Sequence, residues 1–202
     1  WIMPIIKTTI AKNYIFMIWE IKEEVEDLLQ ILNANAIELE EINRIKHLDR
    51  KKQNISARIL LNHLAAKKVQ LKYHKNGSPY CSEFKNISIS HSKNYCTVIQ
   101  SENLTGIDIQ YRKKNIQNTS IKFINSSDVK SWGKHNSENR LHLIWCTKEA
   151  IYKTLNKSCS LKENIFVISP KKANYQNNQV KIFYNIQHEV INNYFLAIAI
   201  KI

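Results

Sequence analysis

Apolar residues recur along the chain with two different spacings, one that predicts strands and one that predicts helices. Short apolar runs and alternating segments such as Ile-Ser-Ile-Ser at 87–90 are typical of strands, because successive strand side chains point to opposite faces. Segments with apolar residues three and four apart, such as 52–67, are typical of helices. We expect strands over 14–21, 69–73, 87–90, 95–100, 105–110, 165–169, 180–185 and 194–201, and helices over 23–32, 37–47, 52–67, 115–124 and 138–155.

Both halves of the chain combine helices with short strands that we expect to pair antiparallel. This order favours the α+β class, and more finely a pseudo-dimer of two similar α/β lobes with a site at their seam. We expect an N-terminal lobe of residues 1–100 and a C-terminal lobe of residues 101–202, although no clear sequence repeat relates them. Asn-Gly and Pro within 75–79 predict a chain reversal there.

Composition and charge narrow the class of protein. Hydrophobic residues make up 44% of the chain, and Gly and Pro number only three each, so we expect the whole length to fold. The formal charge of +13 attracts polyanions, which leaves nucleic acid, phospholipid, a polyphosphate cofactor or an acidic protein as partners. A nucleic-acid-binding protein stays an alternative, but no helix-turn-helix, RNP or zinc-finger pattern supports it.

Cysteine spacing and hydropathy bear on location. The four cysteines form no C-x-x-C pair, and no secretory leader is recognisable, so we expect reduced thiols in a cytoplasmic protein. Among them, Cys146 is interpreted as a packing residue rather than a nucleophile. No apolar run reaches membrane-spanning length, so no membrane partner is expected.

The strand expected at 105–110 carries the first candidate for metal binding. Alternation places Gly106, Asp108 and Gln110 on one face and turns Ile107 and Ile109 into the core. Mg²⁺ is usually held by one or two carboxylates together with substrate phosphates, a role that suits Asp108. An aspartate facing water is the simpler interpretation of this segment taken alone.

The helix expected at 138–155 carries a second set of charged residues. Glu149 and Lys153 are four apart and share a face with Trp145, while the apolar stripe comprises Leu141, Ile144, Ile151 and Leu155. A Glu-to-Lys pair at this spacing is also an ordinary helix salt bridge.

Elsewhere, His91 lies among Ser88, Ser90 and Ser92, which could contact phosphate oxygens. A serine hydrolase is disfavoured because no G-x-S-x-G segment occurs.

Together these segments resemble a known family. Ile-Ser-Ile-Ser-His-Ser at 87–92, Gly-Ile-Asp-Ile-Gln at 106–110 and Trp-Cys-Thr-Lys-Glu-Ala-Ile-Tyr-Lys at 145–153 resemble the three core motifs of the 4′-phosphopantetheinyl transferases of the two-lobed surfactin-synthetase type. Asn-Gly-Ser-Pro-Tyr at 76–80 is similar to the Gly-Lys-Pro turn of that family. The resemblance covers roughly residues 40–160.

The resemblance implies a transferase that moves the phosphopantetheine arm of coenzyme A to a serine of an apo acyl or peptidyl carrier protein, releasing adenosine 3′,5′-bisphosphate. It implies Mg²⁺, with Mn²⁺ as an alternative, held by Asp108, Gln110 and Glu149. Glu149 or a water that it holds would deprotonate the serine. Lys153 would steady the phosphate charge, and His91 would contact a coenzyme A phosphate.

The resemblance also implies which residues hold coenzyme A and what the partners are. The expected coenzyme A residues are Arg50, Arg58, Gly77, Pro79, Ser90, His91 and Lys153. The two arginines are preferred on the first lobe because a guanidinium grips phosphate bidentately. Carrier protein and coenzyme A are the expected partners, and a monomer suffices because both lobes lie in one chain.

Two positions depart from the family pattern. Gln110 stands where a third acidic ligand is common, which predicts weaker binding of Mg²⁺, and Ser78 replaces the lysine of the Gly-Lys-Pro turn. Since Asp108, Glu149 and Lys153 are all present, an active enzyme is expected. The alternative is a degenerate homologue that binds carrier protein without modifying it.

Overall fold

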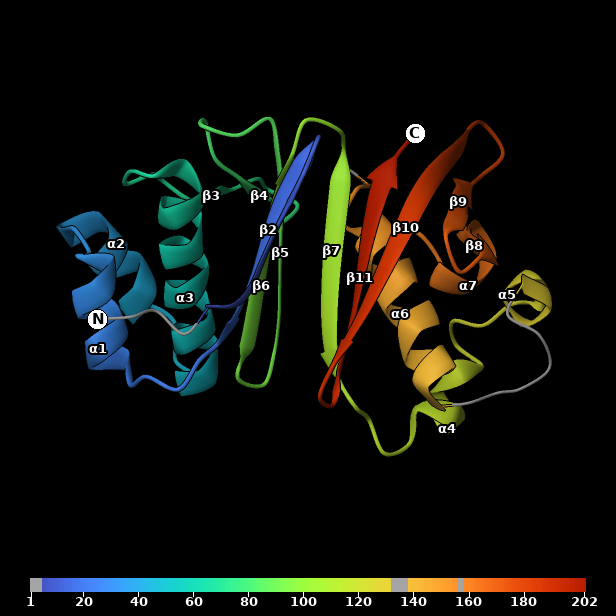
Figure 1. Ribbon diagram of the computed structural model, residues 1–202, viewed down its shortest axis with the longest axis horizontal. Helices are drawn as coiled ribbons and strands as arrows, with labels where there is room; N and C mark the ends of the chain where they lie inside the picture. The colour runs from blue at the N-terminus through green and yellow to red at the C-terminus, as the bar shows by residue number, and fades with distance from the viewer. Residues whose placement is uncertain (1–4, 132–137, 156–157) are drawn as a thin grey trace.

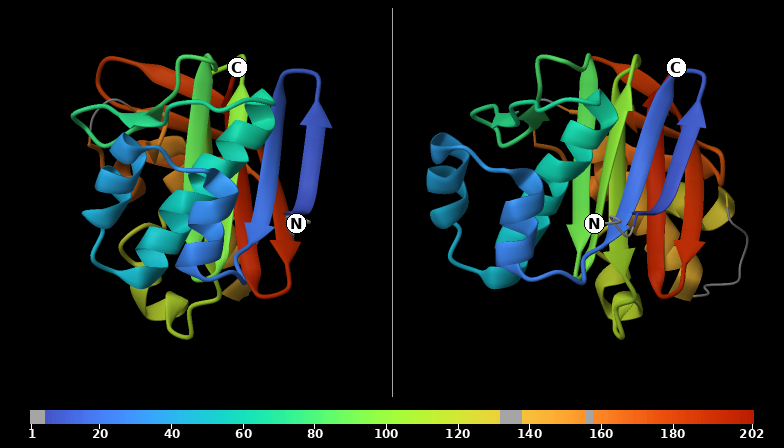
Figure 2. Two further views of the ribbon diagram at one scale, coloured as in Figure 1. Left: turned by 90° about the vertical axis from the view of Figure 1, so that its left-hand side faces the viewer. Right: turned by 60° about the vertical axis from the view of Figure 1, so that its left-hand side comes forward.

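Helices and two antiparallel sheets stack in layers in the computed structural model, which describes residues 5–131, 138–155 and 158–202. The sheets face one another in the middle of the molecule, and helices cover the outer face of each (Figures 1 and 2). The expected α+β class is confirmed. Among the described helices, none is long and apolar enough to cross a membrane.

The first sheet belongs to the first half of the chain and has the strand order β1-β2-β6-β5. Three helices follow β2, and α1 and α3 pack on the outer face of the sheet. A two-stranded hairpin, β3 and β4, precedes β5. The elements are β1 (Ile5–Ala11), β2 (Tyr14–Glu20), α1 (Val25–Leu32), α2 (Ala36–Asn43), α3 (Leu48–Ala65), β3 (Lys72–Tyr73), β4 (Pro79–Tyr80), β5 (Asn86–Ser92) and β6 (Tyr95–Ser101).

The second sheet begins after β6 and has the strand order β7-β11-β10-β9-β8. Its outer face is covered by α6, the longest helix of this half. The elements are β7 (Thr105–Tyr111), α4 (Ile116–Ser120), α5 (Ser126–Ser131), α6 (Glu138–Tyr152), α7 (Leu161–Asn164), β8 (Ile165–Ser169), β9 (Lys172–Gln176), β10 (Lys181–Ile191) and β11 (Tyr194–Lys201).

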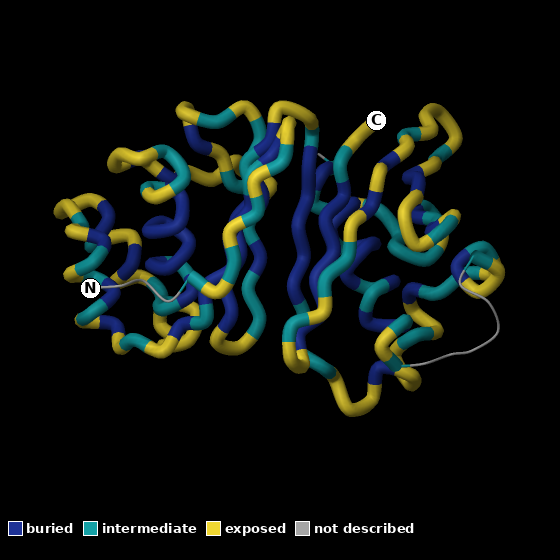
Figure 3. Tube along the Cα trace, in the orientation of Figure 1, coloured by how far each residue is buried: buried dark blue, intermediate teal, exposed yellow. Residues whose placement is uncertain are grey.

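The side chains of β2 show how the layers are held together. Phe16 and Ile18 pack against the second sheet, whereas Met17 and Trp19 pack against α1 and α3. Both faces of this strand are therefore buried, which explains its continuous apolar run. The buried trace is concentrated in the facing strands and in the helix faces beside them (Figure 3).

Several elements differ from the sequence-based expectation. The pattern does not predict β1, β9 or α5, because β1 is a half-exposed edge strand, β9 is rich in polar residues and α5 is short. Helix α3 begins at Leu48 rather than at 52. Strand β10 runs to Ile191 because its hairpin with β11 keeps pairing up to Tyr194. The reversal at 75–79 is confirmed, and Gly77 there has a φ of 83°.

Three serine hydroxyls join the two sheets edge to edge. Strand β7 pairs with β11 on one side only, which leaves a row of backbone N–H groups on the other side. The hydroxyls accept these N–H groups in matching order: Ser88 from Ile107 at 3.1 Å, Ser90 from Ile109 at 3.1 Å, and Ser92 from Tyr111 at 2.9 Å. Strands β5 and β7 therefore run in the same direction at a fixed offset.

A buried ion pair fixes the orientation of α6. Lys148 Nζ lies 2.6 Å from Asp128 Oδ2, and both side chains are fully buried. The ammonium also donates to the carbonyl oxygens of Leu161 and Ile165, and Asp128 accepts the N–H of Val167 at 2.8 Å. The pair thus ties α5, α6 and β8 together beside Glu149.

We expect Asp128→Asn to lower the free energy of unfolding by about 3–5 kcal/mol, because it leaves the Lys148 ammonium buried without a counter-charge. Urea unfolding measures the change. The half-exposed pair of Lys7 and Glu189, at 2.6 Å, supplies the control, and Glu189→Gln should cost less than about 1 kcal/mol. Equal losses in the two variants would contradict the structural role given to the buried pair.

Candidate active site

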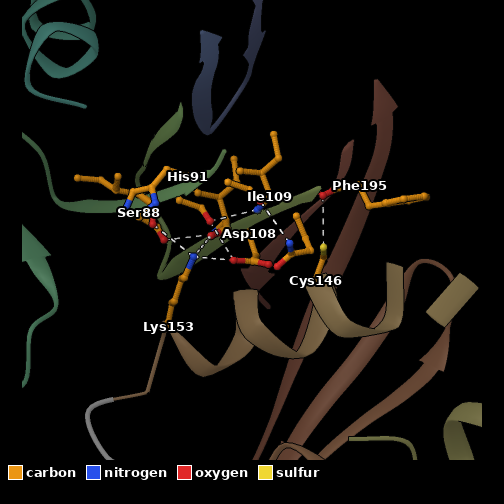
Figure 4. A network of polar contacts seen from close by, with 12 residues as sticks. Ser88, His91, Asp108, Ile109, Cys146, Lys153 and Phe195 are labelled. Atoms are coloured by element: carbon orange, nitrogen blue, oxygen red, sulfur yellow. Dashed lines mark hydrogen bonds and ion pairs between the residues drawn. The ribbon is translucent and has the colours of Figure 1, made fainter. Parts of the chain in front are cut away.

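Asp108 is the central acidic residue at the seam. It lies on β7 with only 7% of its surface exposed. Its Oδ1 accepts hydrogen bonds from Ser90 Oγ at 2.9 Å and from Lys153 Nζ at 2.8 Å (Figure 4). An aspartate facing water, the simpler interpretation of this segment, is therefore wrong.

Gly106 allows α6 to approach β7 closely enough to form this site. A Cβ atom at Gly106 would lie 1.9 Å from the carbonyl oxygen of Ala150. A backbone atom cannot move out of the way as a flexible side chain can, so glycine is required here. Ala150 is the neighbour of Glu149, so the same contact holds the glutamate beside β7.

Glu149 and Asp108 influence one another electrostatically. The pKa of Glu149 is raised, first by burial and then by the negative charge of Asp108, while Lys153 and Lys113 oppose the shift. Two carboxylates from different elements therefore share one partly desolvated region. Such a pair is suited to bind a cation, which would relieve the repulsion between the two carboxylates.

Lys153 connects the acidic residues to both sheets. It follows the last residue of α6, and its Nζ donates to the carbonyl oxygens of Ile89 on β5 at 3.3 Å and Ile107 on β7 at 2.9 Å. With the bond to Asp108, all three ammonium protons have acceptors. Lys153 is therefore held in one position at the seam rather than extended into solvent.

Ser90 and Gln110 are used differently from the sequence-based expectation. The Ser90 hydroxyl, predicted to contact coenzyme A, is engaged by Asp108 and by the N–H of Ile109. Gln110, predicted as a metal ligand, donates its amide to Ser92 Oγ at 3.3 Å and to the carbonyl oxygen of Tyr111 at 3.0 Å. Both residues thus help to hold β7 in place.

His91 lies on the opposite face of β5 from the serines, next to Arg50 of α3. Nη1 of Arg50 is 3.2 Å from each ring nitrogen of His91. Burial lowers the pKa of His91 to about 4, and the charges of Arg50 and Lys153 add to the effect. His91 is therefore a neutral imidazole at pH 7.

A pocket of about 460 Å³ opens beside Lys153. The turn before β4 forms one wall through Gly77 and Pro79, β5 forms the second, and the end of α6 forms the third with Tyr152 and Lys153. The structure therefore brings together Gly77, Pro79 and Lys153, which the sequence predicts as coenzyme A residues from segments far apart in the chain.

Arg58 lies away from this pocket. Its side chain is 4% exposed, and it pairs with Glu41 at 2.7 Å and with Asn54 at 3.0 Å. It lines a second pocket of about 640 Å³ that also contains Arg44 and Lys72. Its buried Nη1 has no hydrogen-bond partner within the described part of the chain. The two arginines preferred from the sequence thus occupy separate places.

Cys146 is a buried packing residue, as its sequence context suggests. Its Sγ donates to the carbonyl oxygen of Phe195 at 3.3 Å (Figure 4). Burial, and next the charge of Asp108, raise the pKa of the thiol well above its usual range. The thiol stays protonated at neutral pH and is a poor nucleophile.

The sequence does not predict where two lysines, Lys113 and Lys93, lie. Lys113 Nζ lies 4.9 Å from the ring centre of Trp145 and acts on Glu149 electrostatically. Lys93 Nζ lies 3.6 Å from the ring centre of Tyr111. The basic run at 112–114 is visible in the sequence, but nothing in it shows that one member lies over a tryptophan four residues before Glu149.

The site offers Mg²⁺ few protein ligands. Within 5–131, 138–155 and 158–202, no three or more His, Cys, Asp or Glu side chains are grouped to hold a metal. Mg²⁺ does not need such a cage, since it commonly takes one or two carboxylates and completes its shell with water and substrate phosphates. Asp108 and Glu149 fit that more open arrangement.

The sequence matches no protein-family model, and no curated protein matches it.

We expect Arg50→Gln to raise the pKa of His91 from about 4 toward its usual 6.5, because a cation that repels the imidazolium is removed. The rise should be partial, since burial is the larger cause. NMR titration of the histidine ring protons measures it. His188, whose pKa burial lowers to about 4, is the internal reference and should not move.

The lowered pKa of His91 also makes the stability of the folded protein depend on pH. Below about pH 6.5 the unfolded chain takes up a proton that folded His91 does not, so stability falls as the pH drops from 6.5 toward 4. Arg50→Gln should make that fall smaller. An unchanged His91 titration would show that the guanidinium does not act on the ring.

Proposed function

We propose that this protein is a Mg²⁺-dependent 4′-phosphopantetheinyl transferase of the two-lobed surfactin-synthetase type, acting in the cytoplasm on coenzyme A and an apo acyl or peptidyl carrier protein. One observation carries the proposal. Asp108 and Glu149, from β7 and α6, interact electrostatically beside Lys153, and Lys153 also lines the pocket walled by the turn at 76–79. These are the residues on which the sequence resemblance depends.

The two acids and the lysine suit transfer of a phosphoryl-linked group. Asp108 and Glu149 would hold Mg²⁺ on the diphosphate of coenzyme A, where the ion neutralises developing negative charge. Lys153, fixed by two backbone carbonyls, adds a positive charge whose position does not depend on the ligand. Positioning and charge neutralisation are the main sources of rate in such reactions.

Glu149 is suited to take the proton of the carrier serine. Its pKa is raised by burial and by Asp108, and Glu149, or a water that it holds, would accept the proton of the serine. Deprotonation forms the serine oxygen nucleophile, the new P–O bond forms on the transferred phosphate, and adenosine 3′,5′-bisphosphate leaves with the electrons of the broken P–O bond.

The positive field supports binding of coenzyme A on the first lobe. Arg50 of α3 lies beside His91, and Arg58, Arg44 and Lys72 line the second pocket. Tyr80 lines this second pocket, and it also lines a smaller pocket that reaches Pro79 and Lys153. Through Tyr80, the cations of the second pocket lie next to the smaller pocket that Lys153 lines.

A degenerate homologue is the second candidate function. Lys153 is occupied by two carbonyls and Asp108, and the Gln110 amide is tied to the backbone, so both have structural roles that would survive loss of catalysis. A nucleic-acid-binding protein has only the +13 charge in its favour. Salt-sensitive binding to random DNA without binding to coenzyme A would favour it.

The deciding experiment is incubation of the protein with coenzyme A, Mg²⁺ and several apo carrier proteins, followed by intact mass measurement. We expect one carrier to gain a single phosphopantetheine unit. Glu149→Gln should slow transfer by at least about 100-fold, because it removes the base and one metal ligand. Glu163→Gln, on an exposed glutamate of α7, should not change it. Absence of transfer to every carrier, with coenzyme A bound, would favour the degenerate homologue.

We expect Gln110→Glu to lower the Mg²⁺ concentration that gives half-maximal transfer, because a third carboxylate beside Asp108 attracts the cation more strongly. Transfer rates across a Mg²⁺ series measure it. Gln117→Glu adds the same charge at an exposed position of α4 and is the control. An unchanged or increased Mg²⁺ requirement in Gln110→Glu would show that position 110 does not face the metal.

A further inference from the structure

Ser88 and Ser90 perform the same structural task, but only one of them also contacts the acidic site. Each accepts a backbone N–H of β7 at 3.1 Å, and their exposed fractions are 3% and 6%. Within the described residues, Ser90 is the one of the two that hydrogen-bonds Asp108, at 2.9 Å. A comparison of the two serines therefore separates the effect of the hydrogen bond to β7 from the effect of the hydrogen bond to Asp108.

The hydrogen bond between Ser90 and Asp108 has a defined donor and acceptor. The N–H of Ile109 points at its oxygen, so the single hydroxyl proton is the one donated to Asp108 Oδ1. Lys153 Nζ donates to the same oxygen from the end of α6. Two donors from different elements thus restrain the Asp108 carboxylate, and hydrogen bonds to an ionised acceptor are the stronger kind.

We propose that Ser90 is a positioning residue, which orients the Asp108 carboxylate so that it can share a divalent cation with Glu149. This inference rests on the proposed function for its cation. It differs from the role that the sequence resemblance implies for Ser90, because the hydroxyl acts on the protein's own carboxylate and not on coenzyme A. Partners that orient metal ligands typically contribute 10-fold to 100-fold in metal affinity.

The test compares Ser90→Ala with Ser88→Ala in the full-length protein. Each variant leaves one buried N–H of β7 without its acceptor, so both should lower the urea midpoint, and Ser90→Ala should lower it further because it also loses the hydrogen bond to Asp108. Binding of Mn²⁺, followed by electron paramagnetic resonance with and without coenzyme A, separates them. We expect Ser90→Ala to raise the Mn²⁺ dissociation constant about 10-fold, and Ser88→Ala to leave it within about twofold of the wild type.

Conservative variants keep the test decisive. Ser90→Thr keeps the hydroxyl and should restore the wild-type Mn²⁺ dissociation constant. If Ser90→Ala does not fold, the comparison is made between Ser90→Cys and Ser88→Cys, since a thiol fills the space but donates weakly, and the same order is expected. Equal weakening of Mn²⁺ binding by the matched variants, or none, overturns the positioning role.

The same measurements distinguish this inference from the proposed function. Mn²⁺ binding that depends on Ser90, without transfer to any carrier protein, would support the positioning role and count against the enzyme. Transfer by Ser90→Ala with an unchanged Mg²⁺ requirement would support the enzyme and overturn the positioning role. No Mn²⁺ binding by the wild type, with or without coenzyme A, overturns the role of Ser90.

Discussion

The row of hydrogen bonds between β5 and β7 is the constraint on which the arrangement of this molecule depends. Two sheets that pack only through apolar side chains can slide, because the hydrophobic effect has no direction. Three serine hydroxyls remove that freedom, since each one matches a particular N–H of β7. Lys153 adds a cross-connection between the carbonyl oxygens of the same two strands. We call this row of contacts between β5 and β7 the joint. The acidic site, Asp108 and Glu149, lies directly beside it.

Desolvation and charge then determine the chemistry of the joint. Burial lowers the pKa of His91 and raises that of Glu149, so near neutral pH one is an uncharged imidazole and the other a comparatively basic carboxylate. The shift at Glu149 needs α6 to lie close against β7. Gly106 permits that approach, and the buried pair of Lys148 and Asp128 keeps the helix from rotating about its axis.

The sequence predicts much of the fold because the segments richest in apolar residues are also the best buried. Strand β2 and helices α3 and α6 are examples, and the edge strand β1 and the polar β9 are missed because half-exposed or polar strands carry little pattern. Asp108, Glu149 and Lys153 can be chosen from motifs, and the structure places them together. The roles of Ser90 and Gln110 cannot be read in this way. Alternating serines look the same whether they face water, a ligand or another strand.

The joint between β5 and β7 also affects how the molecule meets copies of itself. Unpaired strand edges are templates for aggregation, and the joint removes one edge from each large sheet. The remaining outer strands are β1 and β8, and the pairing of each is interrupted by a register shift, between Ile5 and Lys7 in one and between Val167 and Ser169 in the other. Irregular edges of this kind are poor templates for a foreign strand. The contact that builds the site thus also helps to keep a protein with two open sheets from polymerising.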